Sequence, residues 1–231
     1  MPEAGERALT IDVSERAGRV SALLRRPADA RWLAVLAHGA GADMRHAFLE
    51  RMAGALAARG VATLRFQFPY TEAGRRRPDV GPVLERTVRA AVAAAAREAP
   101  GLPLLAGGKS MGGRMASQAQ AREPLPGVRG IFFLGFPLHA ARKPDAARGA
   151  HLAQAVLPLL FLQGTRDALA DLSLLRPVIA GLGARATLHV VEGGDHSFRV
   201  PKRSGRDDDA VRQELVDVLA AWVGRVLQES Q

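Results

Sequence analysis

Short apolar runs rich in branched residues alternate along this chain with longer alanine-rich stretches, and only a narrow group of folds accommodates that pattern. The alternation is typical of a parallel β-sheet that carries helices on both faces. The apolar runs also lack the polar residues of a half-exposed strand, as expected for strands buried between two helical layers. We predict the parallel strands at Trp32–Ala37, Ala62–Phe68, Leu102–Ala106, Val128–Gly135, Leu159–Gln163 and Ala186–Val191.

The N-terminal segment shows a different pattern. Thr10–Val13 and Arg19–Arg25 alternate apolar with other residues, and Gly18 lies between them, which predicts a hairpin at an antiparallel edge of the sheet. The fold class is therefore α/β, with a mostly parallel sheet of about eight strands. The alanine-rich stretches are predicted to be helices at Arg45–Arg59, Pro82–Ala99, Ser110–Arg122, Leu172–Leu182 and Asp207–Gln228.

The length of 231 residues suits one α/β domain, and we predict a single domain over residues 1–231. The sequence contains no internal repeat and no long linker. Residues 139–154, between two predicted strands, are too few and too polar for a large hydrophobic cap. We therefore expect a minimal lid and an open or shallow pocket.

Composition excludes several kinds of chemistry. The chain has no cysteine, so it can have no disulfide, no thiolate metal site and no cysteine nucleophile. The longest apolar runs, such as Val156–Leu162, fall far short of the roughly 18 residues of a membrane span, and the N-terminus has no apolar signal core. We expect a cytoplasmic protein without membrane contact.

The formal net charge of +9 raises the alternative of a nucleic-acid partner. However, arginine supplies most of the basic residues and is spread through the chain, and the one tight run, Arg75–Arg77, has no interleaved aromatic residues for base stacking. We expect a solvated, arginine-rich surface and no nucleic-acid partner.

The strongest chemical signal is Gly108-Lys109-Ser110-Met111-Gly112, which follows an apolar strand and opens a helix. In that context Gly-x-Ser-x-Gly forms a strained turn that exposes the serine hydroxyl above the sheet, and its neighbours must be small. The alternative is a glycine-rich turn with an incidental serine. We predict that Ser110 is a nucleophile.

A serine nucleophile requires a histidine base and a carboxylate that orients it. Asp167 and His196 each follow a later predicted strand, and parallel strands deliver their carboxyl ends to one edge of the sheet. We predict that they complete a Ser–His–Asp triad. Asp195 is adjacent to His196 and poorly placed to reach its imidazole, so we interpret it as a loop-stabilising residue.

Acyl transfer also needs donors for the oxyanion. The backbone N–H of Met111 follows the nucleophile directly, and the loop around Gly39 and Ala40 follows an earlier strand. We predict the N–H groups of Met111 and Ala40 as the oxyanion hole. A simple glycine-rich turn is the alternative for this loop.

These residues give the chain a resemblance to the α/β-hydrolase superfamily over nearly its whole length, and within it to a dienelactone-hydrolase-like group. More narrowly, it is similar to small bacterial proteins that share a domain with testis-expressed protein thirty and with the third regulatory subunit of the nonspecific-lethal chromatin complex. The motifs that carry this likeness are His38–Asp43, Arg65–Asp79, Gly108–Arg114, Gln163–Asp167 and Gly193–Phe198.

The resemblance implies an eight-stranded, mostly parallel sheet, no cofactor, no metal, and triad roles for Ser110, Asp167 and His196. It names no substrate, since members of the group are mostly predicted hydrolases and some eukaryotic relatives are scaffold domains. Dienelactone hydrolase itself uses cysteine where this chain has Ser110. That difference argues against dienelactone as the substrate.

A few further residues are candidates for the substrate pocket. Gly39 and Tyr70 are two of them, with covering the sheet edge as the alternative for Tyr70. Arg65 and Arg75–Arg77 could hold an anionic substrate, although we favour solvated side chains or pairs with an acid such as Glu72 or Asp79. The roles of Lys109 and Arg114 stay open, with Lys109 expected to point away from the nucleophile.

Together these features predict a cytoplasmic serine hydrolase, a monomer or homodimer, that cleaves a small soluble ester, with a thioester or amide as less favoured substrates. The alternative is a catalytically idle scaffold of the same fold that binds a protein or a small ligand. Nucleic-acid binding is a third reading.

Overall fold

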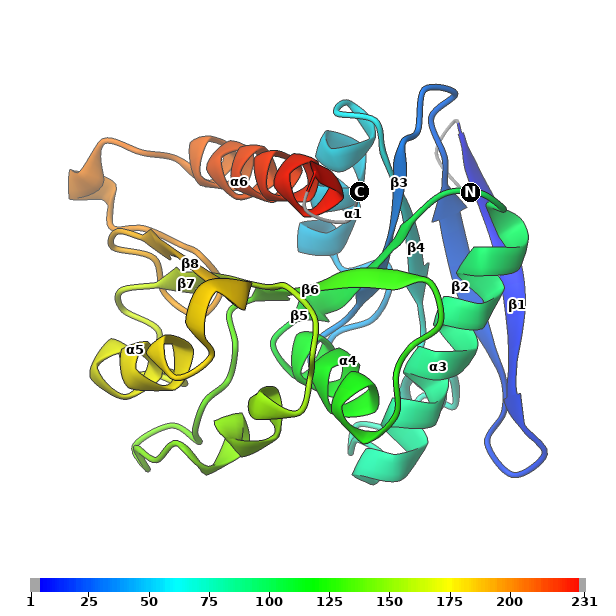
Figure 1. Cartoon of the computed structure of the whole chain (residues 1–231), viewed down its shortest axis with the longest axis horizontal. Coiled ribbons are helices and arrows are strands. Elements are labelled where there is room, and N and C mark those ends of the chain that lie inside the picture. The colour runs from blue at the N-terminus through cyan, green and yellow to red at the C-terminus, as the bar shows by residue number, and fades with distance from the viewer. Residues whose placement is uncertain (1–4, 229–231) are drawn as a thin grey trace.

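The computed structural model describes residues 5–228 and confirms the predicted architecture, one eight-stranded sheet with helices on both faces (Figure 1). The strands lie in the order β1-β2-β4-β3-β5-β6-β7-β8. They are β1 (Glu6–Ser14), β2 (Gly18–Arg25), β3 (Trp32–Ala37), β4 (Val61–Phe66), β5 (Leu104–Lys109), β6 (Val128–Leu134), β7 (Leu159–Gly164) and β8 (Ala186–Val191).

The predicted hairpin lies at one edge of the sheet. β1 pairs antiparallel with β2, with Thr10 opposite Ser21, and β2 pairs antiparallel with β4. The pairs from β4 through β3 and β5 to β8 are parallel. All six central and far-edge strands therefore present their carboxyl ends along the same side of the sheet.

Two predicted strand boundaries were wrong for identifiable reasons. β4 ends at Phe66, because Phe68 donates its N–H to His38 Nε2 (3.2 Å) and precedes the short helix α2 (Pro69–Glu72). β5 begins at Leu104 and not at Leu102, since Pro103 has no N–H to offer a neighbouring strand. β3 and β8 have the predicted bounds, and the other strand and helix boundaries differ from the predicted ones by at most a few residues.

The helices form two layers (Figure 1): α1 and α6 cover one face of the sheet, and α3, α4 and α5 cover the other. Each layer buries its own apolar cluster, in which leucine and phenylalanine side chains are almost fully removed from solvent. Each such side chain contributes about 1.5–3 kcal/mol relative to an exposed position. The longer helices are α1 (Ala47–Ala57), α3 (Gly81–Glu98), α4 (Met111–Arg122), α5 (Leu172–Ala180) and α6 (Asp208–Gln228).

The segment between β6 and β7 is more ordered than its polar sequence suggests. It contains a 3-10 helix, η1 (Ala147–Ala153), that packs against α4 and buries Leu152 completely. This segment is the one for which we predicted at most a minimal lid. Within residues 5–228, no helix combines the length and the apolar character of a membrane span.

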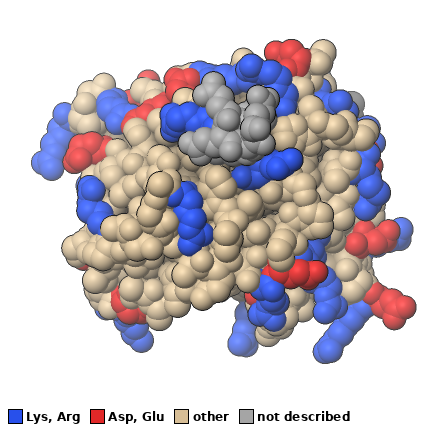
Figure 2. Space-filling view, viewed as in Figure 1, with Lys and Arg blue, Asp and Glu red and all other residues tan. Residues whose placement is uncertain are grey.

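Charged side chains are spread over the face of the molecule that Figure 2 shows. In Figure 2, lysine and arginine are spread over the visible face with aspartate and glutamate among them, and they do not gather into one patch.

Candidate active site

Ser110 lies between β5 and α4 in a backbone conformation that non-glycine residues rarely adopt, with φ 52° and ψ −117°. The turn fits only because the residues two positions before and after Ser110 are glycines. A Cβ on Gly108 would lie 2.2 Å from the carbonyl oxygen of Ala37, and one on Gly112 would lie 2.5 Å from the same atom. The close approach of β3 to this turn therefore requires both glycines.

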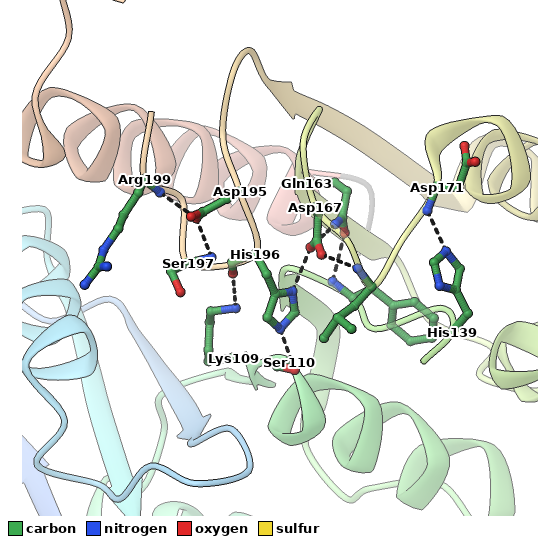
Figure 3. Close-up of polar contacts among 12 residues, drawn as sticks. Lys109, Ser110, His139, Gln163, Asp167, Asp171, Asp195, His196, Ser197 and Arg199 are labelled. Carbon is green, nitrogen blue, oxygen red and sulfur yellow. Dashed lines mark hydrogen bonds and ion pairs between the residues drawn. The ribbon is translucent and has the colours of Figure 1, made fainter. Parts of the chain in front are cut away.

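The three residues predicted as a triad lie together (Figure 3). His196 Nε2 is 2.8 Å from Ser110 Oγ, and His196 Nδ1 is 2.7 Å from Asp167 Oδ2. The Asp167 side chain is fully buried, whereas a quarter of the His196 side chain is exposed. Ser110 follows β5, Asp167 follows β7 and His196 follows β8, so three carboxyl ends of one sheet bring them together.

Sequence reasoning missed Gln163, which holds Asp167 in place. Gln163 is fully buried in β7, donates from Nε2 to Asp167 Oδ2 (2.5 Å) and accepts from the Phe136 N–H (2.9 Å). Asp167 Oδ1 also accepts from the Leu169 N–H at 2.8 Å. A polar residue inside an otherwise apolar strand was the signal that could have revealed Gln163.

Our expectation for Lys109 was wrong. Its side chain does not point away from the nucleophile: Lys109 Nζ donates to the backbone carbonyl of His196 (Figure 3). The ammonium group also lies 5.5 Å from the centroid of the Phe198 ring. Burial lowers the pKa of Lys109 from its ordinary value to about 8, against the opposing influence of Asp167 and Asp195.

The glycine-rich loop after β3 lies beside Ser110. A Cβ on Gly39 would be 3.5 Å from Ser110 Cβ, and Gly39 and Ala40 line the same cavity as Ser110 and His196. Among the residues that the structure describes, no backbone hydrogen bond uses the Ala40 N–H as donor. The Met111 N–H belongs to the first turn of α4, where N–H groups have no partner within the helix.

The cavity at Ser110 has a volume of about 560 Å³ and lies between elements that are far apart in the sequence. The loop after β3, helix α1, the β5–α4 turn, the loop after β8 and helix α6 all contribute to its wall. Its cationic side chains outnumber its single carboxylate, Asp208. They are Arg51, Lys109, Arg199 and Arg212.

Arg65 and Tyr70 do not line this cavity, contrary to the prediction that they could contribute to a substrate pocket. Arg65 is buried within β4, pairs with Glu6 and donates to the Met44 carbonyl at 2.9 Å. Its partners are therefore neither Glu72 nor Asp79, the acids we had favoured.

Tyr70 is also buried, and its ring stacks on Phe68 with 6.4 Å between centroids. It contributes to a separate hollow, which Arg75 and Arg76 also line. Arg75 itself pairs with Asp79 at 2.7 Å.

Asp195 stabilises its loop, as predicted. Its Oδ1 accepts from the N–H groups of Ser197 (2.8 Å) and Arg199 (2.9 Å). Its carboxylate therefore holds the turn that carries His196.

A second serine–histidine contact joins Ser117 Oγ to His151 Nε2 at 2.7 Å. Ser117 is fully buried on α4, and its hydroxyl also lies 2.9 Å from the Arg114 carbonyl. No carboxylate of the described residues hydrogen-bonds to His151, and burial lowers the pKa of His151 to about 4. This neutral, enclosed pair lacks both the orienting acid and the open cavity that Ser110 has.

Within the described part of the chain, no group of three or more histidine, aspartate or glutamate side chains is arranged to hold a metal ion.

Comparison with known proteins places this geometry in a wider group. Residues 30–224 match a family model described as "Alpha/beta hydrolase domain". A dienelactone hydrolase from Anabaena variabilis is 19% identical with a TM-score of 0.74, over 95% of this chain and 97% of that one. An alpha-beta serine hydrolase homologue from Coxiella burnetii is 18% identical with a TM-score of 0.73, over 93% and 96% of the two chains.

A third similar structure is that of XC6422 from Xanthomonas campestris, which is described as an α/β serine hydrolase without lid. It is 18% identical to this chain with a TM-score of 0.69, over 99% of this chain and 96% of that one. At these identities the structural likeness establishes the fold.

Proposed function

Since this chain belongs to the alpha/beta hydrolase domain family, we propose that it is a serine hydrolase that cleaves a small ester through an acyl-enzyme on Ser110. The observation that carries the proposal is the continuous pair of short contacts from Ser110 Oγ to His196 and from His196 to Asp167. A structural serine has no need of a partly exposed imidazole backed by a buried carboxylate.

The proposed reaction follows from the different partners of the two ring nitrogens of His196. Asp167 accepts a hydrogen bond from the Nδ1–H of His196, which keeps that proton on Nδ1 and leaves the lone pair of Nε2 free to take the hydroxyl proton of Ser110 as its oxygen attacks the ester carbonyl. The N–H groups of Met111 and Ala40 stabilise the resulting oxyanion. His196 then returns the proton to the leaving alcohol, and a water molecule activated by the same base releases the acid.

The residues that line the cavity favour a small, charged substrate. The cavity is open, and a large apolar cap is absent from the described residues around it. The guanidinium group of Arg199 makes no salt bridge or hydrogen bond in the described part of the chain, and that of Arg51 interacts with Asp209 only at longer range, so both can pair with an anionic group in the cavity that they line. We therefore propose an ester that carries a carboxylate.

Labelling with a fluorophosphonate tests the proposed nucleophile, because this reagent reacts with an activated serine. We expect modification at Ser110, found by digestion and mass spectrometry, and its loss by at least about 10³-fold in Ser110→Ala and His196→Ala. Ser117→Ala is the matched control, since it removes the other serine that contacts a histidine, and it should retain labelling. A folded wild-type protein that stays unlabelled would favour the idle scaffold.

The narrower likeness to the group that includes testis-expressed protein thirty stays a prediction, as do the cytoplasmic location and the oligomeric state.

A further inference from the structure

We propose that Lys109 is a positioning residue for the acyl transfer: its ammonium group ties the backbone of His196 to the strand that precedes Ser110 and keeps the imidazole within reach of the nucleophile. This inference rests on the proposed function of the same site.

The tie joins two segments that the sheet alone does not hold together. Lys109 is the last residue of β5, whereas His196 lies in the loop after β8, three strands away in the sheet order. Lys109 Nζ donates to the His196 carbonyl, and in the described part of the chain no other donor reaches that oxygen. Apart from the contacts of the His196 side chain with Ser110 and Asp167, the hydrogen bonds of this loop around His196 run to β8, to the segment after β7 or within the loop. An example is the bond from the Arg166 N–H to the Gly194 carbonyl at 2.8 Å.

Space for the ammonium group exists because residue 135 is glycine. Gly135 follows β6 with φ +75°, and a Cβ there would lie 3.1 Å from Lys109 Nζ and 3.5 Å from both Asp167 Oδ2 and His196 Cε1. A Cβ at this position would crowd the ammonium group and would contact the other two groups at an ordinary van der Waals distance. The backbone of Gly135 therefore lies next to the side chains of Lys109, Asp167 and His196.

The charged groups around Lys109 come from several elements. Asp167 after β7 and Asp195 after β8 both favour the ammonium form, whereas burial favours the neutral amine and has the larger effect. His196 and Phe198 contact the group directly. The cavity further contains the cations and titratable groups of α1 and its approach, α6 and the loop after β8: His46, Arg51, Arg199, Asp208 and Arg212.

With a pKa of about 8, Lys109 is an ammonium ion at neutral pH and loses its charge in mildly alkaline solution. The loss converts a charge-assisted hydrogen bond into a neutral one of roughly half the strength and removes the attraction to the Phe198 ring. General-base catalysis, in contrast, gives no fall in rate by itself as the pH rises. A fall in the rate of Ser110 labelling at alkaline pH would therefore report the loss of the charge on Lys109.

The experiment compares wild-type protein with Lys109→Met, which keeps the length of the side chain but removes its donor and charge. Lys143→Met is the matched control, because Lys143 is an exposed lysine between β6 and η1. Two quantities are measured: hydrogen–deuterium exchange of the amides in residues 194–200, and the pH dependence of fluorophosphonate labelling. We expect exchange about tenfold faster and labelling about tenfold slower in Lys109→Met alone.

Between about pH 7 and about pH 9.5, labelling should fall severalfold in wild type and in Lys143→Met, and should not fall in Lys109→Met. In Lys109→Arg, which stays charged over this range, the labelling rate should not decrease with pH either. This variant provides the same test should the methionine variant fail to fold.

Unchanged exchange together with an unchanged pH profile in the folded variants would overturn the positioning role, while labelled Ser110 would still support the proposed function. Faster exchange in Lys109→Met with no labelling of wild type would instead refute the hydrolase and retain the tie as a structural one.

Discussion

Asp167 is fixed by two neighbours apart from His196. Gln163 donates to Oδ2, and the Leu169 N–H donates to Oδ1, so the carboxylate has one orientation in which to receive the imidazole. Gln163 is in turn oriented by the Phe136 N–H. At the scale of the residue, the geometry of the proposed site thus depends on a buried amide, that of Gln163, to which the sequence analysis assigned no role.

Replacing Gln163 by leucine removes both of its hydrogen bonds at nearly constant volume. We expect the free energy of unfolding to fall by about 1–3 kcal/mol, because the buried Phe136 N–H loses its acceptor. Labelling of Ser110 should slow by about tenfold as Asp167 gains freedom to rotate. Urea denaturation and labelling kinetics measure the two effects. Gln213→Leu, at an exposed position of α6, should change neither, and equal effects in both variants would contradict the role of Gln163.

The strand–turn–helix element is held together by contacts that glycine alone permits. Gly108 has φ +153° and lies against the backbone of Ala37 in β3, and Gly112 packs against the same carbonyl from the first turn of α4. These contacts bring the β5–α4 turn next to the loop that contains Gly39 and Ala40. The same absence of side chains that permits the strained turn therefore also brings the predicted oxyanion donors together.

Gly108→Ala tests this close approach. A methyl group 2.2 Å from a carbonyl oxygen must push β3 and β5 apart, so we expect a destabilisation of at least about 3 kcal/mol, with loss of labelling in any folded fraction. Gly224→Ala is the control, because no atom lies within 4 Å of the Cβ that it would add to helix α6. That variant should be more stable by about 0.5–1 kcal/mol. Thermal or urea unfolding of both variants decides the matter, and a neutral Gly108→Ala would show that β3 can move.

At the scale of the whole molecule, the cavity forms where the α1–α6 layer meets the carboxyl ends of the strands. Asp209 pairs with Arg212 at 2.7 Å and interacts with Arg51 at longer range, whereas the Arg199 guanidinium has no salt bridge among the described residues. A positive potential beside Ser110 is consequently a property of the assembled domain and of no single segment.

Substrate preference follows from that potential. We expect the p-nitrophenyl half-ester of succinate to be cleaved with a kcat/KM about tenfold above that of the neutral butyrate ester, and long-chain esters to be poorer than acetate. In Arg199→Gln the advantage of the charged ester should shrink severalfold, with the neutral ester unaffected. Arg203→Gln, an exposed neighbour outside the cavity, serves as the control. Equal kcat/KM for charged and neutral esters would refute recognition of an anion.

The predictable part of the fold followed from local chemistry. Alternating apolar runs and alanine-rich stretches indicated the sheet and its two helical layers, and Ser110 could be singled out because its glycines and its strand–helix setting are neighbours in sequence. Asp167 and His196 were identified from their order and their places after strands, since parallel strands share one edge. The contact of Lys109 could not be predicted, because its partner, the His196 carbonyl, lies in a distant segment. Gln163 was missed, although a polar residue in an apolar strand four residues before Asp167 was visible in the sequence.

The chain's own order of residues thus determined the layered architecture and pointed to the three side chains of the proposed triad, because period, turn chemistry and strand succession are encoded within short stretches. Only the tertiary structure decided which cationic side chains lie near Ser110. Arg65 is buried in the interior, where it pairs with Glu6, whereas Arg51 and Arg199 line the cavity although they are nearly 150 residues apart in the sequence. The reason is physical: a side chain's direction and charge partners are fixed by packing between segments, and the sequence pattern of one segment contains no record of its neighbours.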